Sequence, residues 1–117
     1  MILIGNDIVE ISKIKRFIEE YNYKFLDKVF SEDEQEFCNN RANPVIHLAG
    51  RFAGKEAVKK ILLQIRQKSV PLKKIEIRRT SKGPPLVYLN KKLKNEIQVS
   101  ISHTDKYATA VAVFEQK

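Results

Sequence analysis

The chain has a single cysteine, Cys38, no tryptophan, and no run of apolar residues long enough to cross a membrane. One cysteine excludes an intramolecular disulfide and a metal centre built on several thiolates. The first residues carry neither a basic segment nor a long apolar segment, so we predict no signal peptide. Together these absences predict a small protein of the cytoplasm.

Two common nucleotide-binding signatures are also missing. The chain has only four glycines, and they form neither a phosphate-binding P-loop nor a dinucleotide-binding fingerprint. The usual backbone cradles for ATP and NAD are therefore excluded. Other ways of binding a phosphate group, through side chains or a metal ion, stay open.

Positive charge is concentrated in the second half of the chain. The net charge is +8, and residues 61–117 hold twelve basic and four acidic side chains, against ten of each in residues 1–60. A basic half attracts nucleic acid, an acidic protein or a phosphate-rich small molecule. Few aromatic residues accompany these charges, which disfavours binding of single-stranded nucleic acid. A solvated basic surface without a specific partner is the alternative.

The first forty residues predict a strand and two helices. The apolar residues of segment 1–10 indicate a strand. A helix is predicted over 13–21, with Ser12 as its N-cap. Ser31-Glu32-Asp33-Glu34 is a capping box, so a second helix is predicted to begin there and to end near Asn39.

A longer helix is predicted in the middle of the chain. From Pro44 to about Arg66 the apolar residues recur at helical spacing, which corresponds to a helix roughly 35 Å long. Gly50 and Gly54 lie one turn apart in it. We expect them to let another backbone pack close to this helix.

After Pro71 the apolar residues alternate with a period of two, which is typical of strands. The expected elements are strands at 75–78, 86–89, 97–101 and 107–114, a turn at 82–85, one helical turn at 90–95 and a hairpin loop at 103–106. The predicted fold class is α+β, with an antiparallel sheet packed on one long central helix. We expect one domain, residues 1–117.

Three polar residues lie at positions that a purely structural role explains poorly. Asp7 interrupts an apolar strand, Glu56 lies within the long helix, and His103 ends a strand at a tight loop. Two carboxylates from distant segments are a common way to hold Mg²⁺. The alternatives are a capping or turn role for Asp7, a surface ion pair between Glu56 and Lys60, and an ordinary exposed histidine at 103.

The same helix carries several cations. Arg51, Lys55 and Lys59 follow one another at i+4, and we expect them to form a cationic stripe. Lys60 shares a helix face with Glu56 instead. A metal-binding carboxylate flanked by lysines suits a phosphate-bearing ligand better than a sugar or a fatty acid. Cys38, in a polar helix, is predicted to be inert.

Three segments carry a resemblance to a known family. They are Gly5-Asn6-Asp7-Ile8-Val9-Glu10-Ile11, the helical segment from Arg51 to Lys60 (RFAGKEAVKK), and Ser100-Ile101-Ser102-His103-Thr104 followed by Tyr107-Ala108-Thr109-Ala110. In order, spacing and total length the chain resembles the bacterial holo-[acyl-carrier-protein] synthases, the short type of 4′-phosphopantetheinyl transferase. The resemblance covers essentially the whole chain.

The resemblance implies an activity and its residues. The phosphopantetheine arm of coenzyme A would move to a serine of apo acyl carrier protein, releasing adenosine 3′,5′-bisphosphate, in support of fatty acid synthesis. Asp7 and Glu56 would bind Mg²⁺, and the general base would be one of them or a water on the metal. Lys60 would contact the phosphates of coenzyme A. The residues expected to line or support the coenzyme A site are Arg51, Lys55, Ser102, His103 and Thr104.

The resemblance also implies partners. The family's homotrimers have sites between subunits, which would place Asp7 and Glu56 from different chains beside one coenzyme A. The carrier protein would dock on basic residues of the first helix and beyond, namely Lys13, Arg16, Lys24 and Lys28.

The chain departs from the family's pattern in one turn, where it has Gly83-Pro84-Pro85 and the family often has Gly-Lys-Pro. The rival prediction is a small basic nucleic-acid-binding module. That reading leaves Asp7 and Glu56 unexplained, because carboxylates repel phosphate unless a metal lies between them.

Overall fold

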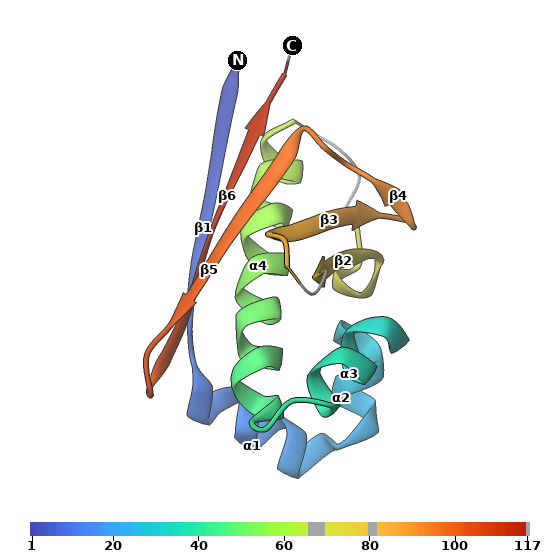
Figure 1. Ribbon diagram of the computed structural model, residues 1–117, viewed down its shortest axis with the longest axis vertical. Coiled ribbons are helices and arrows are strands. Elements are labelled where there is room, and N and C mark those ends of the chain that lie inside the picture. Colours follow the sequence, from blue (N-terminus) through green and yellow to red (C-terminus); the bar gives the residue numbers. More distant parts are fainter. Residues whose placement is uncertain (66–69, 80–81, 117) are drawn as a thin grey trace.

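Helix α4 (Pro44–Gln64) stands at the centre of the molecule. The computed structural model describes residues 1–65, 70–79 and 82–116. Eleven of the helix's residues are buried, and they lie on more than one of its faces. A helix that is buried on several faces must have other elements packed around it. Figure 1 shows strands on two sides of α4 and shorter helices at its N-terminal end.

The first sheet contains both ends of the described chain. It consists of β1 (Ile2–Glu10), β6 (Tyr107–Glu115) and β5 (Ile97–His103), in the order β1-β6-β5, and both pairings are antiparallel. The residues of β6 that face α4 are alanines, Ala108, Ala110 and Ala112, all fully or almost fully buried. Their small side chains allow the helix to lie close to the sheet.

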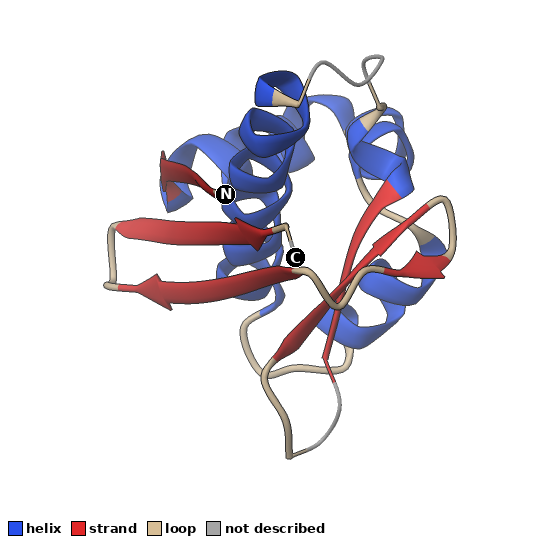
Figure 2. Ribbon diagram, turned by 90° about the horizontal axis from the view of Figure 1, so that it is seen from above, coloured by secondary structure: helices blue, strands red, loops and turns tan. Residues whose placement is uncertain are grey.

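The second sheet packs on another side of α4. It consists of β2 (Ile75–Arg79), β3 (Pro85–Leu89) and β4 (Lys92–Leu93), preceded by the short 3-10 helix η1 (Leu72–Lys74). Seen from above, the two sheets are separate (Figure 2). The predicted α+β class and central helix are confirmed, and the described strands form two three-stranded sheets around that helix.

Three short helices gather at the N-terminal end of α4: α1 (Ile11–Tyr21), α2 (Tyr23–Val29) and α3 (Glu32–Asn39). The capping box of Ser31 and Glu34 at the start of α3 is confirmed. The predicted cap at Ser12 is wrong, because α1 begins two residues before the predicted start and Glu10 is at the N-cap position. Its first backbone N–H, that of Ile11, donates to Lys106 O at 2.9 Å instead.

Two further predictions fail for reasons of backbone conformation. Sequence patterns missed α2, which follows directly after Asn22, a residue with φ of 49°. The expected helical turn at 90–95 is a β-hairpin. Asn90 and Lys91 both have positive φ, and they form the two-residue loop between Leu89 and Lys92, which pair. The predicted helix end at Arg66 lies outside the described residues, and α4 ends at Gln64.

The backbones of β1 and α4 come close together at Gly5. A Cβ there would lie 2.1 Å from the carbonyl oxygen of Ala57, so β1 rests directly on α4. The expected backbone contact at Gly50 and Gly54 is wrong, because both glycines make room for the side chain of Ile101. No helix in the described part of the chain is long and apolar enough to cross a membrane.

Candidate functional site

Asp7 and Lys60 meet where β1 lies on α4. The Nζ atom of Lys60 is 3.3 Å from Asp7 Oδ1 and donates to Asn6 O at 2.6 Å. Gln64, one turn further along α4, donates to Ile4 O at 3.0 Å. The side chain of Asp7 is only 19% exposed, whereas that of Lys60 is 48% exposed. Lys60 and Gln64 therefore hold the carbonyls of β1 and fix Asp7 against the helix.

Glu56 precedes Lys60 by one turn of α4. The contacts of Gln64 with Ile4 and of Lys60 with Asn6 show that β1 and α4 run in opposite directions. A two-residue step along a strand spans about 6.6 Å, and a four-residue step along a helix about 6 Å. Glu56, one turn before Lys60, therefore comes level with the residue after Asp7. Within one chain, Asp7 of β1 and Glu56 of α4 therefore lie at neighbouring heights along the helix. The expectation that the two residues meet from different chains stays a prediction.

The donors at this place fit a magnesium ion. Asp7 and Glu56 supply two carboxylates, and Mg²⁺ in proteins commonly takes one or two carboxylates and leaves its other positions to water and substrate phosphates. Glu56 is only half-buried and makes no ion pair within residues 1–65, 70–79 and 82–116. The same ranges contain no cluster of three or more histidine, cysteine or acidic side chains suited to a metal.

Two arginines and two histidines line a small cavity between α4, the second sheet and the end of β5. The cavity has a volume of about 70 Å³ and is lined by His47 and Arg51 from α4, Arg79 from β2 and His103 from β5. Burial and these positive neighbours lower the pKa of His47 below its ordinary value. A cavity edged by four basic side chains is suited to an anion.

Arg51 is the most buried of these groups. It is 4% exposed, and its Nε atom has no hydrogen-bond partner in the described structure. The guanidinium also borders a second cavity of about 160 Å³, which Phe37 lines as well. Buried arginine donors are ordinarily paired. Donors left free at the edge of two cavities point to an acceptor that the described residues do not supply.

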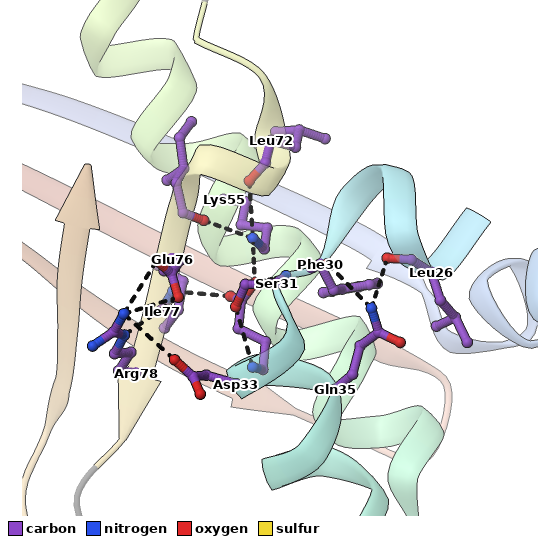
Figure 3. A network of polar contacts seen from close by, with 12 residues as sticks. Leu26, Phe30, Ser31, Asp33, Gln35, Lys55, Leu72, Glu76, Ile77 and Arg78 are labelled. Carbon is purple, nitrogen blue, oxygen red and sulfur yellow. Dashed lines mark hydrogen bonds and ion pairs between the residues drawn. The ribbon is translucent and has the colours of Figure 1, made fainter. Parts of the chain in front are cut away.

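Lys55 is buried beneath these cavities rather than exposed at their edge. Its side chain is fully buried and pairs with Glu34, with Nζ 2.5 Å from Oε1 (Figure 3). The same ammonium donates to Leu72 O at 2.9 Å and to Ile75 O at 2.6 Å. All three donors are thus used inside the protein. Lys55 cannot line a ligand site here, and the expected cationic stripe of Arg51, Lys55 and Lys59 is largely buried.

Glu34 completes a closed network across three elements. Its carboxylate accepts from the backbone N–H of Ser31 and of Ile77, both at 2.9 Å, besides the contact with Lys55. Burial raises the pKa of Glu34 and lowers the pKa of Lys55, and each charge partly offsets the shift of the other. The pair joins α3, α4 and the start of β2.

The hairpin between β5 and β6 carries the remaining predicted residues. His103 reaches the cavity beside Arg51. Thr104 Oγ1 accepts from the backbone N–H of Lys106 and of Tyr107, at 3.1 and 3.0 Å, so it shapes the turn. Ser102 is exposed, and its carbonyl accepts from Thr109 at 3.5 Å. The structure brings His103 to Arg51, and it leaves Ser102 and Thr104 on the exposed hairpin.

Comparison with known proteins identifies the family. A model of the 4′-phosphopantetheinyl transferase superfamily matches residues 3–112. The chain belongs to this superfamily. It is 47% identical over 113 residues to a holo-[acyl-carrier-protein] synthase of Thermodesulfovibrio yellowstonii, covering 94% of this chain and 95% of that protein. The synthase of Protochlamydia amoebophila is 42% identical over 116 residues and 95% of both chains.

Solved structures agree with this assignment. The chain superposes with a TM-score of 0.79 on Helicobacter pylori holo-[acyl-carrier-protein] synthase in complex with coenzyme A, at 31% identity, covering 97% of this chain and 100% of that one. The Bacillus anthracis synthase, in complex with CoA (3′,5′-ADP), gives a TM-score of 0.78 at 27% identity over 97% and 96% of the two chains. The protein is an enzyme, a phosphopantetheinyl transferase.

The basic residues predicted to receive a partner of this transferase lie on α1 and α2. Lys24 and Lys28 edge an open groove of about 280 Å³ whose floor is Phe17, Tyr21 and Phe25. Lys13 lies over the ring of Phe17, 5.7 Å from its centroid. Arg16 is exposed on the same helix. The sequence indicated the lysines, but the aromatic floor depends on α2, which sequence patterns missed.

Sequence reasoning on this transferase also missed His47, Arg79 and Phe37. No local signal marks them, because they reach Arg51 from separate elements. Cys38 is fully buried, and burial raises the pKa of its thiol to about 11, in keeping with the predicted inert role.

The buried pair of Lys55 and Glu34 yields a stability prediction. We expect Lys55→Met to lower the free energy of unfolding by about 3–5 kcal/mol, because it leaves the carboxylate buried without its counter-charge. Adding Glu34→Gln should recover part of that loss. Lys59→Met, one turn further along α4, should change stability by about 0.5 kcal/mol or less. Urea denaturation measures all three, and a Lys55→Met protein as stable as wild type would refute the structural role.

Proposed function

We propose that this transferase moves the phosphopantetheine arm of coenzyme A to a serine of apo acyl carrier protein, in a Mg²⁺-dependent reaction that releases adenosine 3′,5′-bisphosphate. Its supply of holo carrier protein would serve fatty acid synthesis in the cytoplasm. The names of the relatives and the coenzyme A complexes of two neighbours support the substrate. The observation that carries the proposal is the contact of Asp7 with Lys60, one helical turn from Glu56.

Three residues on one side of α4 would handle the pyrophosphate of coenzyme A. Asp7 and Glu56 would hold Mg²⁺, which when bound neutralises the charge that develops on the phosphoryl oxygens. Lys60 is half-exposed, so its ammonium can donate to a phosphate oxygen from the same place. The proton of the attacking serine would pass to one of these two carboxylates or to a water molecule beside them.

The cavity beside Arg51 would receive a further anionic group of the same substrate. Coenzyme A carries a phosphate on its ribose besides the pyrophosphate, and that group needs its own donors. Arg51 supplies N–H groups without a partner in the described chain, and His103 lies at the same cavity. Lys55 would act here only as support, because its ammonium is fully engaged with Glu34 and two carbonyls. Ser102 and Thr104 would contribute from the exposed hairpin.

The groove on α1 and α2 would receive the carrier protein. An aromatic floor edged by lysines suits a partner segment with apolar residues on one face and acidic residues around them. Lys13 and Arg16 would extend this positive edge along α1, and Lys24 and Lys28 provide it on α2. The attraction would speed encounter with an acidic carrier more than it would tighten binding.

The outer face of the first sheet supports a homotrimer with sites near the subunit boundaries. Ile2, Ile4 and Ile8 of β1 are 60–63% exposed, and Val111 of β6 is 46% exposed. These side chains share the sheet face that points away from α4. Exposed apolar side chains gathered on one face are typical of a protein interface. We propose that copies of this chain cover one another there.

The rival function, a nucleic-acid-binding module, rests on the net charge of +8 and on its concentration after residue 60. It gives no role to the carboxylates of Asp7 and Glu56 beside Lys60. DNA binding that needs no metal and falls steeply with salt would favour it.

The metal assignment predicts the effect of Glu56→Gln. We expect a loss of at least about a hundredfold in turnover and weaker binding of Mg²⁺, with an unchanged melting temperature, because the change removes one ligand charge from a half-buried side chain. Transfer is measured by the mass of the carrier protein, and metal binding by calorimetry. Glu36→Gln, on the exposed face of α3, is the matched control and should behave as wild type. Near-normal turnover in Glu56→Gln would refute the assignment.

The docking groove predicts a change in the use of the carrier protein. Lys13→Glu combined with Arg16→Glu should raise the KM for apo carrier protein by about tenfold and leave the affinity for coenzyme A within about twofold. The control is Lys74→Glu combined with Lys92→Glu, two exposed lysines of η1 and β4. Steady-state kinetics at varied concentrations of apo carrier protein measure this KM. Equal KM values for the two double variants would reject this docking face.

The trimer predicts a dependence of assembly on the outer face of β1. Ile4→Glu should convert the protein to monomers, because a buried charge at an apolar interface is costly. Leu63→Glu introduces the same charge at a 56% exposed apolar residue of α4 and should leave the assembly intact. Sedimentation velocity measures the state. A wild-type protein that stays monomeric at micromolar concentration would contradict the proposal.

A further inference from the structure

Phe37 of α3 contacts three of the basic residues near the anion cavity. The Cζ atom of Arg41 lies 4.0 Å from the centroid of its ring, and that of Arg51 lies 4.4 Å away. The ring of His47 meets it edge-on, with centroids 6.4 Å apart and an interplanar angle of 80°. No sequence motif includes Phe37. Its ring is the place where Arg41, from the segment after α3, meets Arg51 and His47 of α4.

The guanidinium of Arg51 lies against the ring of Phe37. The guanidinium has no hydrogen bond or ion pair within the described ranges, although the side chain is only 4% exposed. An arginine held by a carboxylate would spend its donors on that partner and lose its net charge. An arginine held by an aromatic face keeps its free donors and its net charge. The ring attracts the cation but accepts no N–H that lies in the guanidinium plane.

The donors kept free in this way border the two cavities described above. Arg51 lines both of them, Phe37 lines the larger one, and His47 the smaller one. Arg41 and Arg79 add positive charge on either side. Two guanidinium groups over one ring repel each other, and the negative face of the ring offsets part of that repulsion. An arriving anion would offset the rest.

We infer that Phe37 is a positioning residue, which fixes the guanidinium of Arg51 by cation–π contact and so keeps its N–H donors free for a phosphate group of coenzyme A. This inference rests on the proposed function. Phe37 itself touches no reacting atom. Its contribution to binding passes through Arg51.

A double-mutant cycle on the affinity for coenzyme A, measured by calorimetry with Mg²⁺, tests this role. Phe37→Leu should weaken binding by about fivefold to tenfold, within the range of a desolvated cation–π contact. Phe37→Tyr keeps the ring and should bind as wild type. In an Arg51→Met background, Phe37→Leu should change the affinity by less than about twofold, because no guanidinium is left to position.

A matched control separates this role from packing. Phe52 of α4 is also half-buried, and within the described structure no cation lies over its ring. Phe52→Leu should leave coenzyme A affinity within about twofold at a comparable cost in melting temperature.

Three results would overturn the inference: full additivity of Phe37→Leu and Arg51→Met, equal weakening by Phe37→Leu and Phe52→Leu, or failure of Phe37→Tyr to restore affinity. If the wild-type protein binds no coenzyme A, the proposed function fails, and the inference fails with it. If wild type binds and the cycle is additive, the inference alone is wrong.

Discussion

The buried ion pair of Glu34 and Lys55 is the interaction on which the rest of the structure depends. Both side chains are fully buried, and between them they accept from or donate to Ser31, Leu72, Ile75 and Ile77 (Figure 3). Burying two charges is costly unless every donor and acceptor is satisfied, and here the partners lie on α3, α4, η1 and β2. The pair therefore fixes the second sheet and the helical cluster relative to the central helix.

Two different faces of the central helix contribute residues to two separate sites. One face meets β1, where Gly5 permits backbone contact and Lys60 holds Asp7 near Glu56. Another face meets α3 and β2, where Arg51 borders the cavities with its donors free. A substrate that carries a pyrophosphate and a separate phosphate needs two binding places at a fixed separation. One rigid helix supplies that separation, provided that the buried pair holds its neighbours in register.

Much of this was predictable from local patterns, and the remainder follows from contacts between distant segments. The capping box of Ser31, the long helix and the alternating strands are local signals, and the structure confirms them. The family motifs indicated Asp7, Glu56 and Arg51. The burial of Lys55 could not be predicted from its i+4 spacing, because its partner Glu34 is twenty-one residues away in sequence. The cavities beside Arg51 form only where α3, α4 and β2 pack together, so no local pattern could indicate their lining residues Phe37, His47 and Arg79. The helix α2 was missed because it follows Asn22, whose positive φ is not indicated by the hydrophobic pattern of the sequence.

The central claim is the transfer reaction, and the mass of the carrier protein tests it most directly. The wild-type chain is mixed with apo acyl carrier protein and coenzyme A, with and without Mg²⁺, and the carrier is weighed by mass spectrometry. The account predicts a gain of one phosphopantetheine arm on a single serine, lost when the metal is omitted. An unmodified carrier in the presence of metal, with several different carrier proteins, would contradict it.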